Sequence, residues 1–133
     1  MIFVCCFNIA SKMFCSCCFR KRNITEYLEN GKTYKGRCIN VVDGDTVDFT
    51  YDNKYKCRIR LSKINAPEMS ETTGVVSRDK LVELINKKKI WVVCRGKDRY
   101  GRFLGEIYLS NNVFTFENSV NDIMLEEGYA DVY

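Results

Sequence analysis

The sequence contains no histidine among its 133 residues, and this absence removes several kinds of catalytic site. Without an imidazole, the chain lacks Ser-His and Cys-His nucleophile pairs, histidine-ligated zinc and the most common general base. Any catalysis must therefore use carboxylates, arginines, lysines, tyrosines or a metal ion held by oxygen atoms. Proline is also scarce, because Pro67 is the single one, and Glu68 follows it directly. A rigid corner thus precedes a carboxylate.

Most of the chain also lacks an excess of either charge. The formal net charge is +4, but residues 36–133 hold 15 basic and 15 acidic side chains, so the surplus lies in the N-terminal part. This balance excludes a bulk-charge argument for nucleic-acid binding by the larger part of the chain. A local cluster of Lys54, Lys56, Arg58 and Arg60 could still face a polyanion.

The length and the hydrophobic content of 46% suit one globular domain. We divide the chain into a cysteine-rich, basic extension, residues 1–35, and a domain, residues 36–133. Three of the eight cysteines, Cys38, Cys57 and Cys94, are spread singly over hydrophobic runs of the domain. They are typical of small buried apolar residues.

The other five cysteines fall within the first eighteen residues. The segment MFCSCCFRKR places Cys15, Cys17 and Cys18 beside phenylalanines and before a basic run, which suits S-palmitoylation and contact with anionic lipid. Acylation would place the protein at the cytoplasmic side of a membrane; otherwise we expect a cytoplasmic protein. Three alternatives stay open: a disordered or non-native leader, a secretion signal, which lacks a basic start and a clear cleavage site, and a cysteine-only metal site. The segment between charges is too short for a membrane span.

From Gly36 onward the sequence predicts short strands and tight turns. Five runs have strand-like composition, and a sixth run, VFTF, follows them; the five are residues 38–42, 46–51, 55–61, 90–94 and 103–109. Asp43-Gly44 predicts a two-residue hairpin, and the DNK segment predicts the next turn. The first three strands therefore form a meander.

Two helices are expected between and after these strands. Residues 75–89 have an amphipathic pattern, with Lys87 to Lys89 in the last turn. Ser119 is a candidate N-cap for residues 120–127, with Asp122 completing a capping box and Gly128 ending the helix. Five strands with helices after the third and the fifth predict a mainly β, α+β fold: a five-stranded barrel of the OB type.

Four side chains could together support phosphodiester chemistry without histidine. Arg60 and Arg102 have planar guanidinium groups suited to phosphate oxygens, and Glu68 could orient or deprotonate a water molecule. Asp45 and the backbone of the NAP segment offer oxygen ligands of the kind that calcium prefers. Taken singly, each residue is more typical of a turn or of a solvated surface.

The ordered set of motifs VVDGDTV, RIRLSKINAPE and KDRYGRFLGEIYL, followed by VNDIMLEEGYADVY, resembles the staphylococcal (thermonuclease-like) nuclease family. The resemblance covers Gly36 to Tyr133 and none of the extension. It implies an OB-fold nuclease that requires Ca²⁺ and cleaves DNA and RNA with little base specificity.

Matched position by position, the resemblance assigns roles to these residues. Asp45 is implied to be a calcium ligand, with Asn65 and the Ala66 carbonyl beside it. Arg60 and Arg102 are implied to be the catalytic phosphate contacts, and Glu68 the catalytic base or water-positioning group.

Three departures from the family pattern affect these expectations. Asn65 stands where the family usually has an aspartate, so we expect weaker calcium binding. The segment between Glu68 and the first helix is short, so the loop beside the site is reduced. The sequence ends at Tyr133 without the further helix usual in the family, which we expect to lower stability.

Two rival functions come from other classes. The first is an OB barrel of little or no activity that binds nucleic acid or protein; the second is a membrane-tethered interaction module in which the extension acts. The presence of Arg60, Glu68 and Arg102 favours a nuclease, whereas Asn65 and the missing last helix favour the binding barrel.

Overall fold

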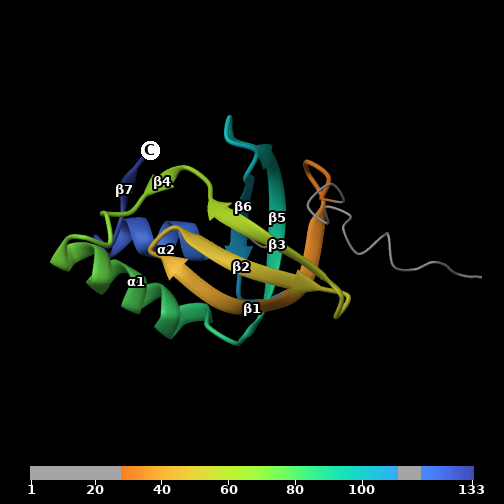
Figure 1. Cartoon of the computed structure of the whole chain (residues 1–133), viewed down its shortest axis with the longest axis horizontal. Helices are drawn as coiled ribbons and strands as arrows, with labels where there is room; N and C mark the ends of the chain where they lie inside the picture. The colour runs from red at the N-terminus through yellow and green to blue at the C-terminus, as the bar shows by residue number, and fades with distance from the viewer. Residues whose placement is uncertain (1–27, 111–117) are drawn as a thin grey trace, which may run out of the picture.

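The computed structural model describes residues 28–110 and 118–133, and within them five strands close into a barrel. The barrel order is β1-β2-β3-β6-β5, with β1 Thr33–Asp43, β2 Thr46–Tyr51, β3 Tyr55–Leu61, β5 Lys89–Lys97 and β6 Phe103–Tyr108. The other elements are β4 Ile64–Asn65, α1 Thr72–Ile85, α2 Val120–Glu126 and β7 Asp131–Val132. Figure 1 shows both helices at one end of the barrel. The expected OB-type α+β fold is confirmed.

The barrel closes because β1 pairs with both β2 and β5, while β3 pairs in parallel with β6. Alternate residues of each strand point inward, which β6 shows in its strict buried and half-buried alternation. At Gly105 of β6, a Cβ atom would lie 2.9 Å from side-chain carbons of Ile59 and Val92, so the barrel interior leaves no space for a side chain there. Cys38, Cys57 and Cys94 are buried free thiols in or beside this core, as predicted.

The two predicted turns of the meander are present. Asp52 and Asn53 make the turn between β2 and β3 with positive φ angles of 57° and 54°, a conformation that these two residue types tolerate. In the β1–β2 hairpin, Asp43 pairs with Thr46, so the two-residue loop consists of Gly44 and Asp45. The predicted hairpin was therefore right in kind but shifted by one residue.

Helix α1 begins and ends earlier than predicted, and the placement of Lys87 to Lys89 in its last turn was wrong. Asn86 is extended and Lys87 has a φ of 63°, so the helix ends before the lysines. The Lys87 amide donates to the Cys38 carbonyl of β1, and β5 starts at Lys89. Pairing with β1 therefore overrides the helical pattern of the lysine run.

Helix α2 has the predicted cap. Ser119 accepts a hydrogen bond from the Asp122 amide, and the Asp122 side chain accepts one from the Ser119 amide. Gly128 follows the helix with a φ of 82°. The buried Asn121 side chain donates to the Ser62 and Gly105 carbonyls and accepts from the Ile107 amide, so it fastens α2 to β6.

The sequence patterns missed the small sheet of β4 and β7. Ile64 pairs with Val132 and Asn65 with Asp131, and the Tyr133 amide donates to the Lys63 carbonyl. Two-residue strands are too short to show an alternating pattern. This pairing holds the end of the chain beside the segment that carries Asn65.

Two sequence predictions fall outside the described residues: the acylated cysteines and the VFTF run. Leu28 is buried in the core and β1 starts at Thr33, so the barrel includes residues that the sequence division had assigned to the extension. Within the described parts of the chain, no helix is long and apolar enough to cross a membrane.

Candidate functional site

Arg60 lies at the end of β3, where its guanidinium group is held in one orientation. Its side chain is buried, with a residue exposure of 7%. Nη1 donates to the Leu61 and Ile64 carbonyls, both at 3.0 Å. Lys63, with a φ of 69°, turns the chain so that the Ile64 carbonyl returns to this position. The guanidinium is therefore preorganised before any ligand binds.

The second nitrogen of Arg60 joins the two predicted metal ligands. Nη2 donates to the Asn65 Oδ1 at 3.1 Å and lies 3.4 Å from the Asp45 Oδ2. The Ala66 amide donates to the same Asp45 oxygen at 2.8 Å, and Thr46 donates its hydroxyl proton to the other. The structure thus brings Asp45, Arg60, Asn65 and Ala66 together. It is the Ala66 amide, rather than its carbonyl, that contacts Asp45.

Gly44 determines how closely the β1–β2 hairpin approaches α1. A Cβ atom at this position would lie 1.9 Å from the Ser77 Oγ and 2.8 Å from the Ala66 Cβ. The φ of Gly44 is not in the left-handed region. The glycine of the DGD motif is therefore required for close packing rather than for a left-handed turn, and this packing positions Asp45.

Asp43 is a carboxylate of this site that the sequence reasoning did not select. Its Oδ1 accepts the Asp45 amide at 3.0 Å. Burial, and next the proximity of the Asp45 carboxylate, raise the pKa of Asp43 above its usual value. The signal was present in the sequence, since Asp43 is the first aspartate of the DGD motif whose second aspartate was chosen.

Asp43→Asn should stabilise the protein at neutral pH. A carboxyl group with a raised folded pKa contributes its stability at low pH and loses it as the pH rises through that pKa, so ionised Asp43 destabilises the fold at pH 7. The amide keeps the oxygen that accepts the Asp45 amide proton. We expect the melting temperature to rise by about 2 to 5 °C at pH 7, with the difference vanishing near about pH 3.

The matched control for this prediction is Asp52→Asn, in an exposed turn that tolerates either residue. Circular dichroism melts of both variants and the wild type at the two pH values provide the comparison. A lower melting temperature for Asp43→Asn at pH 7 would show that the Asp43 charge is stabilising, against this account.

Arg102 reaches the same region from the loop between β5 and β6. Its Nε donates to the Asp98 Oδ2 at 2.7 Å, and the Arg102 and Tyr100 amides both donate to the Asp98 Oδ1. Burial acts to raise the pKa of Asp98, but these hydrogen bonds outweigh it and the pKa lies below its usual value. Asp98 therefore stays ionised and fixes the loop that carries Arg102.

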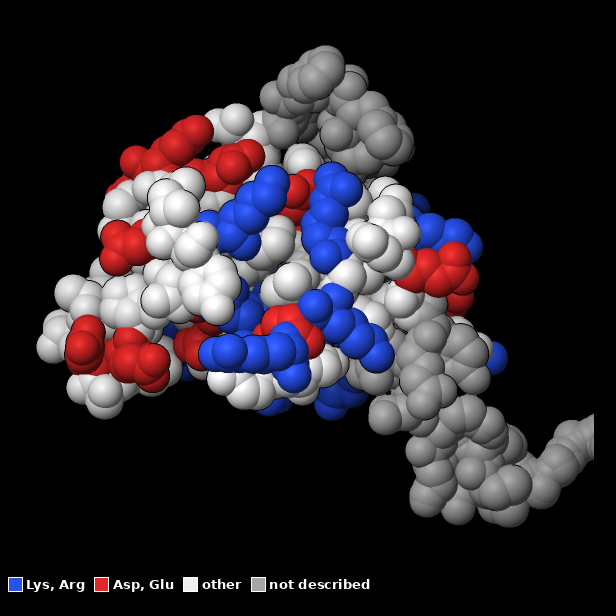
Figure 2. All heavy atoms as spheres, turned by 90° about the horizontal axis from the view of Figure 1, so that it is seen from above, with Lys and Arg blue, Asp and Glu red and all other residues white. Residues whose placement is uncertain are grey.

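Arg60 and Arg102 line one hollow of about 420 Å³ beside β3 and β6. Tyr133 and Tyr100 lie against the two guanidinium groups, with ring centroids 4.9 and 5.6 Å from the respective Cζ atoms. Lys63 and Arg99 add two further cations to the lining. Figure 2 shows basic side chains gathered in the middle of the face that is uppermost in Figure 1. The hollow is suited to an anion.

Glu68 is placed differently from the other predicted residues. It is exposed, and its side chain makes none of the hydrogen bonds or ion pairs found within the described residues. Its backbone is held closely, because a Cβ atom on Gly74 of α1 would lie 1.9 Å from the Glu68 carbonyl oxygen. The structure does not bring the Glu68 carboxylate into contact with Arg60 or Asp45, and it leaves this carboxylate open to solvent.

The oxygen ligands of the site fit a hard cation only in part. Asp43 and Asp45 supply two neighbouring carboxylates. Asn65 supplies an amide oxygen, and the Arg60 Nη2 donates both to this oxygen and to the Asp45 carboxylate. A cation would relieve the repulsion between the two carboxylates. Among the described residues, however, no group of three or more Asp, Glu, Cys or His side chains is arranged to hold a metal ion. The described residues therefore offer two carboxylates and one amide oxygen to a cation.

Comparison with known proteins connects this geometry to a family. Residues 58–133 match the family model described as staphylococcal nuclease homologue. The chain is 38% identical over 98 residues to an uncharacterized endonuclease of Escherichia coli O157:H7, covering 74% of this chain and 60% of that protein. It is 34% identical over 103 residues to a micrococcal nuclease of Shigella flexneri, covering 75% and 59%. It is 39% identical over 75 residues to a probable staphylococcal-like nuclease of Oryza sativa subsp. japonica, covering 56% and 18%.

The closed barrel with its two helices defines a protein of the OB-fold class. The match over more than half of the sequence places it further: the chain belongs to the staphylococcal nuclease family. The chain spans about 60% of the length of the two bacterial relatives.

Proposed function

We propose that this protein is a calcium-dependent nuclease that hydrolyses phosphodiester bonds in DNA, RNA or both with low base specificity. The observation that carries the proposal is the pair Arg60 and Arg102, which come from separate parts of the chain and line the same hollow. Arg60 is fixed by four oxygen acceptors and Arg102 by Asp98. Two oriented guanidinium groups are suited to the charge that spreads over phosphate oxygens during cleavage.

Each residue then has one role in the proposed reaction. Arg60 and Arg102 bind the non-bridging oxygens of the phosphate, and Glu68 accepts a proton from a water molecule. The water oxygen forms a bond to phosphorus as the bond to the leaving oxygen breaks, and the leaving oxygen takes up a proton from solvent water. Asp45, Asn65 and the Ala66 carbonyl would hold calcium, with Asp43 adding negative charge. Calcium, when bound, would help to neutralise the phosphate.

Asn65→Asp should lower the calcium concentration needed for half-maximal cleavage by about tenfold, because each added ligand charge strengthens calcium binding. The aspartate keeps the oxygen that accepts from Arg60. The measurement is the rate of cleavage of single-stranded DNA by the full chain over a calcium titration, with a chelator and with magnesium as further arms. Asn53→Asp, in the β2–β3 turn, adds the same charge away from the site and serves as control.

We expect cleavage to stop with chelator and magnesium to substitute poorly. An unchanged calcium curve for Asn65→Asp would remove Asn65 from the ligand set. Equal rates with and without chelator would rule out the calcium dependence altogether.

A second candidate is a barrel of low activity that binds nucleic acid without efficient cleavage. It is favoured by the two-carboxylate donor set and by the lack of a contact between Glu68 and the arginines. Strong binding of single-stranded DNA with no calcium-dependent cleavage would support it over the nuclease.

We further propose that Cys15, Cys17 and Cys18 are acylated and hold the protein at the cytoplasmic face of a membrane. The support is the sequence alone: adjacent cysteines followed by Arg20, Lys21 and Arg22. Replacing the three cysteines by serine should move the expressed protein from the membrane fraction to the soluble fraction. Unchanged partitioning would contradict this proposal.

A further inference from the structure

Three exposed cations lie in one row across the outside of the barrel. Lys89 of β5 is opposite Arg37 of β1, Arg37 is opposite Thr50 of β2, and Thr50 is opposite Lys56 of β3. Directly opposed residues of antiparallel strands project from the same face of a sheet. Neighbouring strands lie about 4.8 Å apart, so this basic row (Lys89, Arg37, Thr50 and Lys56) spans about 14 Å.

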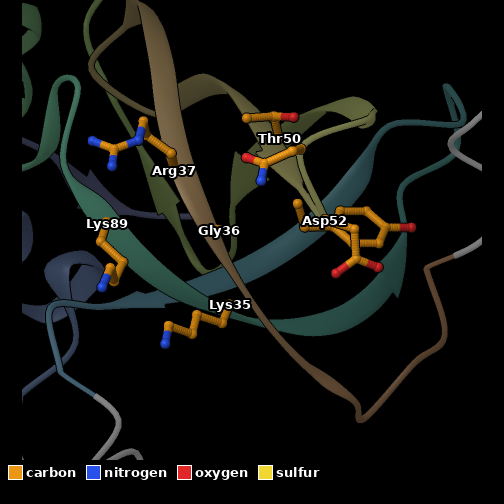
Figure 3. A pocket seen from close by; sticks show the side chains of 8 residues that line it. Lys35, Gly36, Arg37, Thr50, Asp52 and Lys89 are labelled. Carbon is orange, nitrogen blue, oxygen red and sulfur yellow. The ribbon is translucent and has the colours of Figure 1, made fainter.

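A hollow of about 280 Å³ opens beside the basic row, and Lys35 adds a further exposed cation to its lining. Figure 3 shows Lys35, Arg37 and Lys89 around this hollow on strands β1 and β5. Gly36 forms its floor, where a Cβ atom would lie 2.0 Å from the Thr50 carbonyl oxygen. The surface is therefore concave as well as basic.

The charges of the basic row are not neutralised by the protein. Within the part of the chain that the structure describes, Lys35, Arg37, Lys56 and Lys89 form no ion pair, and Asp52 is the one carboxylate that lines the hollow. The Arg37 Nη1 donates to the Lys87 carbonyl at 2.7 Å, which orients its guanidinium without removing its charge. These cations are free to bind an external anion.

Only part of the basic cluster expected on residues 54–60 faces a possible polyanion. Arg58 is held by Asp48 through bonds of 2.8 and 3.2 Å, and Arg60 is buried in the site. Lys56 stays exposed and belongs to the basic row. Lys56, Arg58 and Arg60 alternate along β3, so Lys56, the end of the basic row on β3, lies about 13 Å from Arg60 along the strand.

We propose that the basic row binds the phosphate backbone of the nucleic-acid substrate about four nucleotides away from the phosphate at Arg60, taking about 3.4 Å for each stacked nucleotide. The inference rests on the proposed function, because it takes nucleic acid as the substrate. It deepens that function by assigning a second phosphate-binding surface. The surface adds affinity for long strands without reading bases, and a substrate of two or three nucleotides that occupies the Arg60 site cannot reach it.

An anionic membrane is the other polyanion that this surface could meet. The concave shape of the hollow, and the position of Lys56 on the same strand as Arg60, favour a strand of phosphates over a flat bilayer. The test therefore includes both ligands.

The experiment uses the full chain with three charges removed, Arg37→Gln, Lys56→Gln and Lys89→Gln. The control variant is Lys32→Gln, Arg78→Gln and Arg95→Gln, which removes the same charge from residues ion-paired with Glu29, Asp79 and Glu106. Circular dichroism first establishes that both variants fold. Binding of a 30-nucleotide single-stranded DNA is then measured by fluorescence anisotropy with chelator at several salt concentrations. Binding to vesicles of phosphatidylserine and phosphatidylcholine is measured in parallel. Cleavage kinetics with calcium are measured on the 30-mer and on a dinucleotide.

We expect the row variant to bind the 30-mer roughly ten- to a hundredfold more weakly, with a salt dependence reduced by about two in the log–log slope. Its KM for the 30-mer should rise while kcat, and both constants for the dinucleotide, stay unchanged. Equal losses in the control variant, or a loss for vesicles but not for DNA, would overturn the inference. If the wild type cleaves nothing but the row variant still loses DNA binding, the proposed nuclease activity fails and the binding surface stands.

Discussion

Arg60→Ala is expected to reduce cleavage of single-stranded DNA by at least about 10²- to 10³-fold. The loss follows from the removal of a buried guanidinium whose orientation is fixed before the substrate binds, so that it meets the developing charge without reorganisation. The rate should fall mainly in kcat, because the contact strengthens in the transition state. Steady-state kinetics with calcium measure the effect.

Loss of folding must be separated from loss of catalysis in this variant. Without Arg60, the Asp45 carboxylate and the Leu61 and Ile64 carbonyls lose a donor, which lowers the free energy of unfolding. Circular dichroism shows whether Arg60→Ala is folded. The variant Arg60→Lys keeps the positive charge and is measured beside it. Arg58→Ala is the matched control, since Arg58 is exposed and paired with Asp48. Near wild-type rates for folded Arg60→Ala would remove Arg60 from the catalytic set.

Glu68→Gln is expected to reduce the cleavage rate by about 10²- to 10⁴-fold and to leave DNA binding unchanged. The amide has nearly the shape of the carboxylate but cannot accept a proton from water. Because Glu68 is exposed and its side chain makes no hydrogen bond or ion pair within the described residues, the change should not affect stability. Cleavage rates and anisotropy measurements on the same protein preparation give the two readouts.

Glu71→Gln is the control for this variant, since Glu71 is a second exposed carboxylate three residues further on. An equal fall in the cleavage rate of both variants would indicate that the rate depends on negative charge in general rather than on Glu68 as a base. Cleavage by Glu68→Gln at the wild-type rate would favour a different base and would weaken the match to the nuclease motif at Pro67.

The barrel could be predicted because its strands have clear local signals. The alternation of apolar and polar residues in 55–61, together with turn residues such as Asp52 and Asn53, indicated the strands of the meander. The bounds were less accurate, since β1 begins at Thr33 rather than at residue 38 and β5 extends to Lys97 rather than to residue 94. The strands β4 and β7 could not be predicted, since two residues give no period and their pairing joins distant parts of the chain. The same pairing decides where Asn65 lies.

The motifs selected several residues that the structure brings together, but they did not indicate the contacts between these residues. The motifs indicated Asp45, Arg60 and Arg102, but no pattern shows that Arg60 bonds to two carbonyls of its own turn. The raised pKa of Asp43 depends on its burial and on its proximity to the Asp45 carboxylate, and neither can be read from the spacing of the two residues in the sequence. Tertiary contacts of this kind depend on the whole barrel rather than on local sequence.

The central claim is that Arg60 and Arg102 act on one phosphate in the hollow that both line. The most direct measurement is a double-mutant cycle: calcium-dependent cleavage of single-stranded DNA by the full chain, by Arg60→Ala, by Arg102→Ala and by the double variant. Two groups that act on one transition state give losses that do not add, so the double variant should lose little more than the worse single variant. Losses in free energy that add fully, or single variants that cleave like the wild type, would contradict the account.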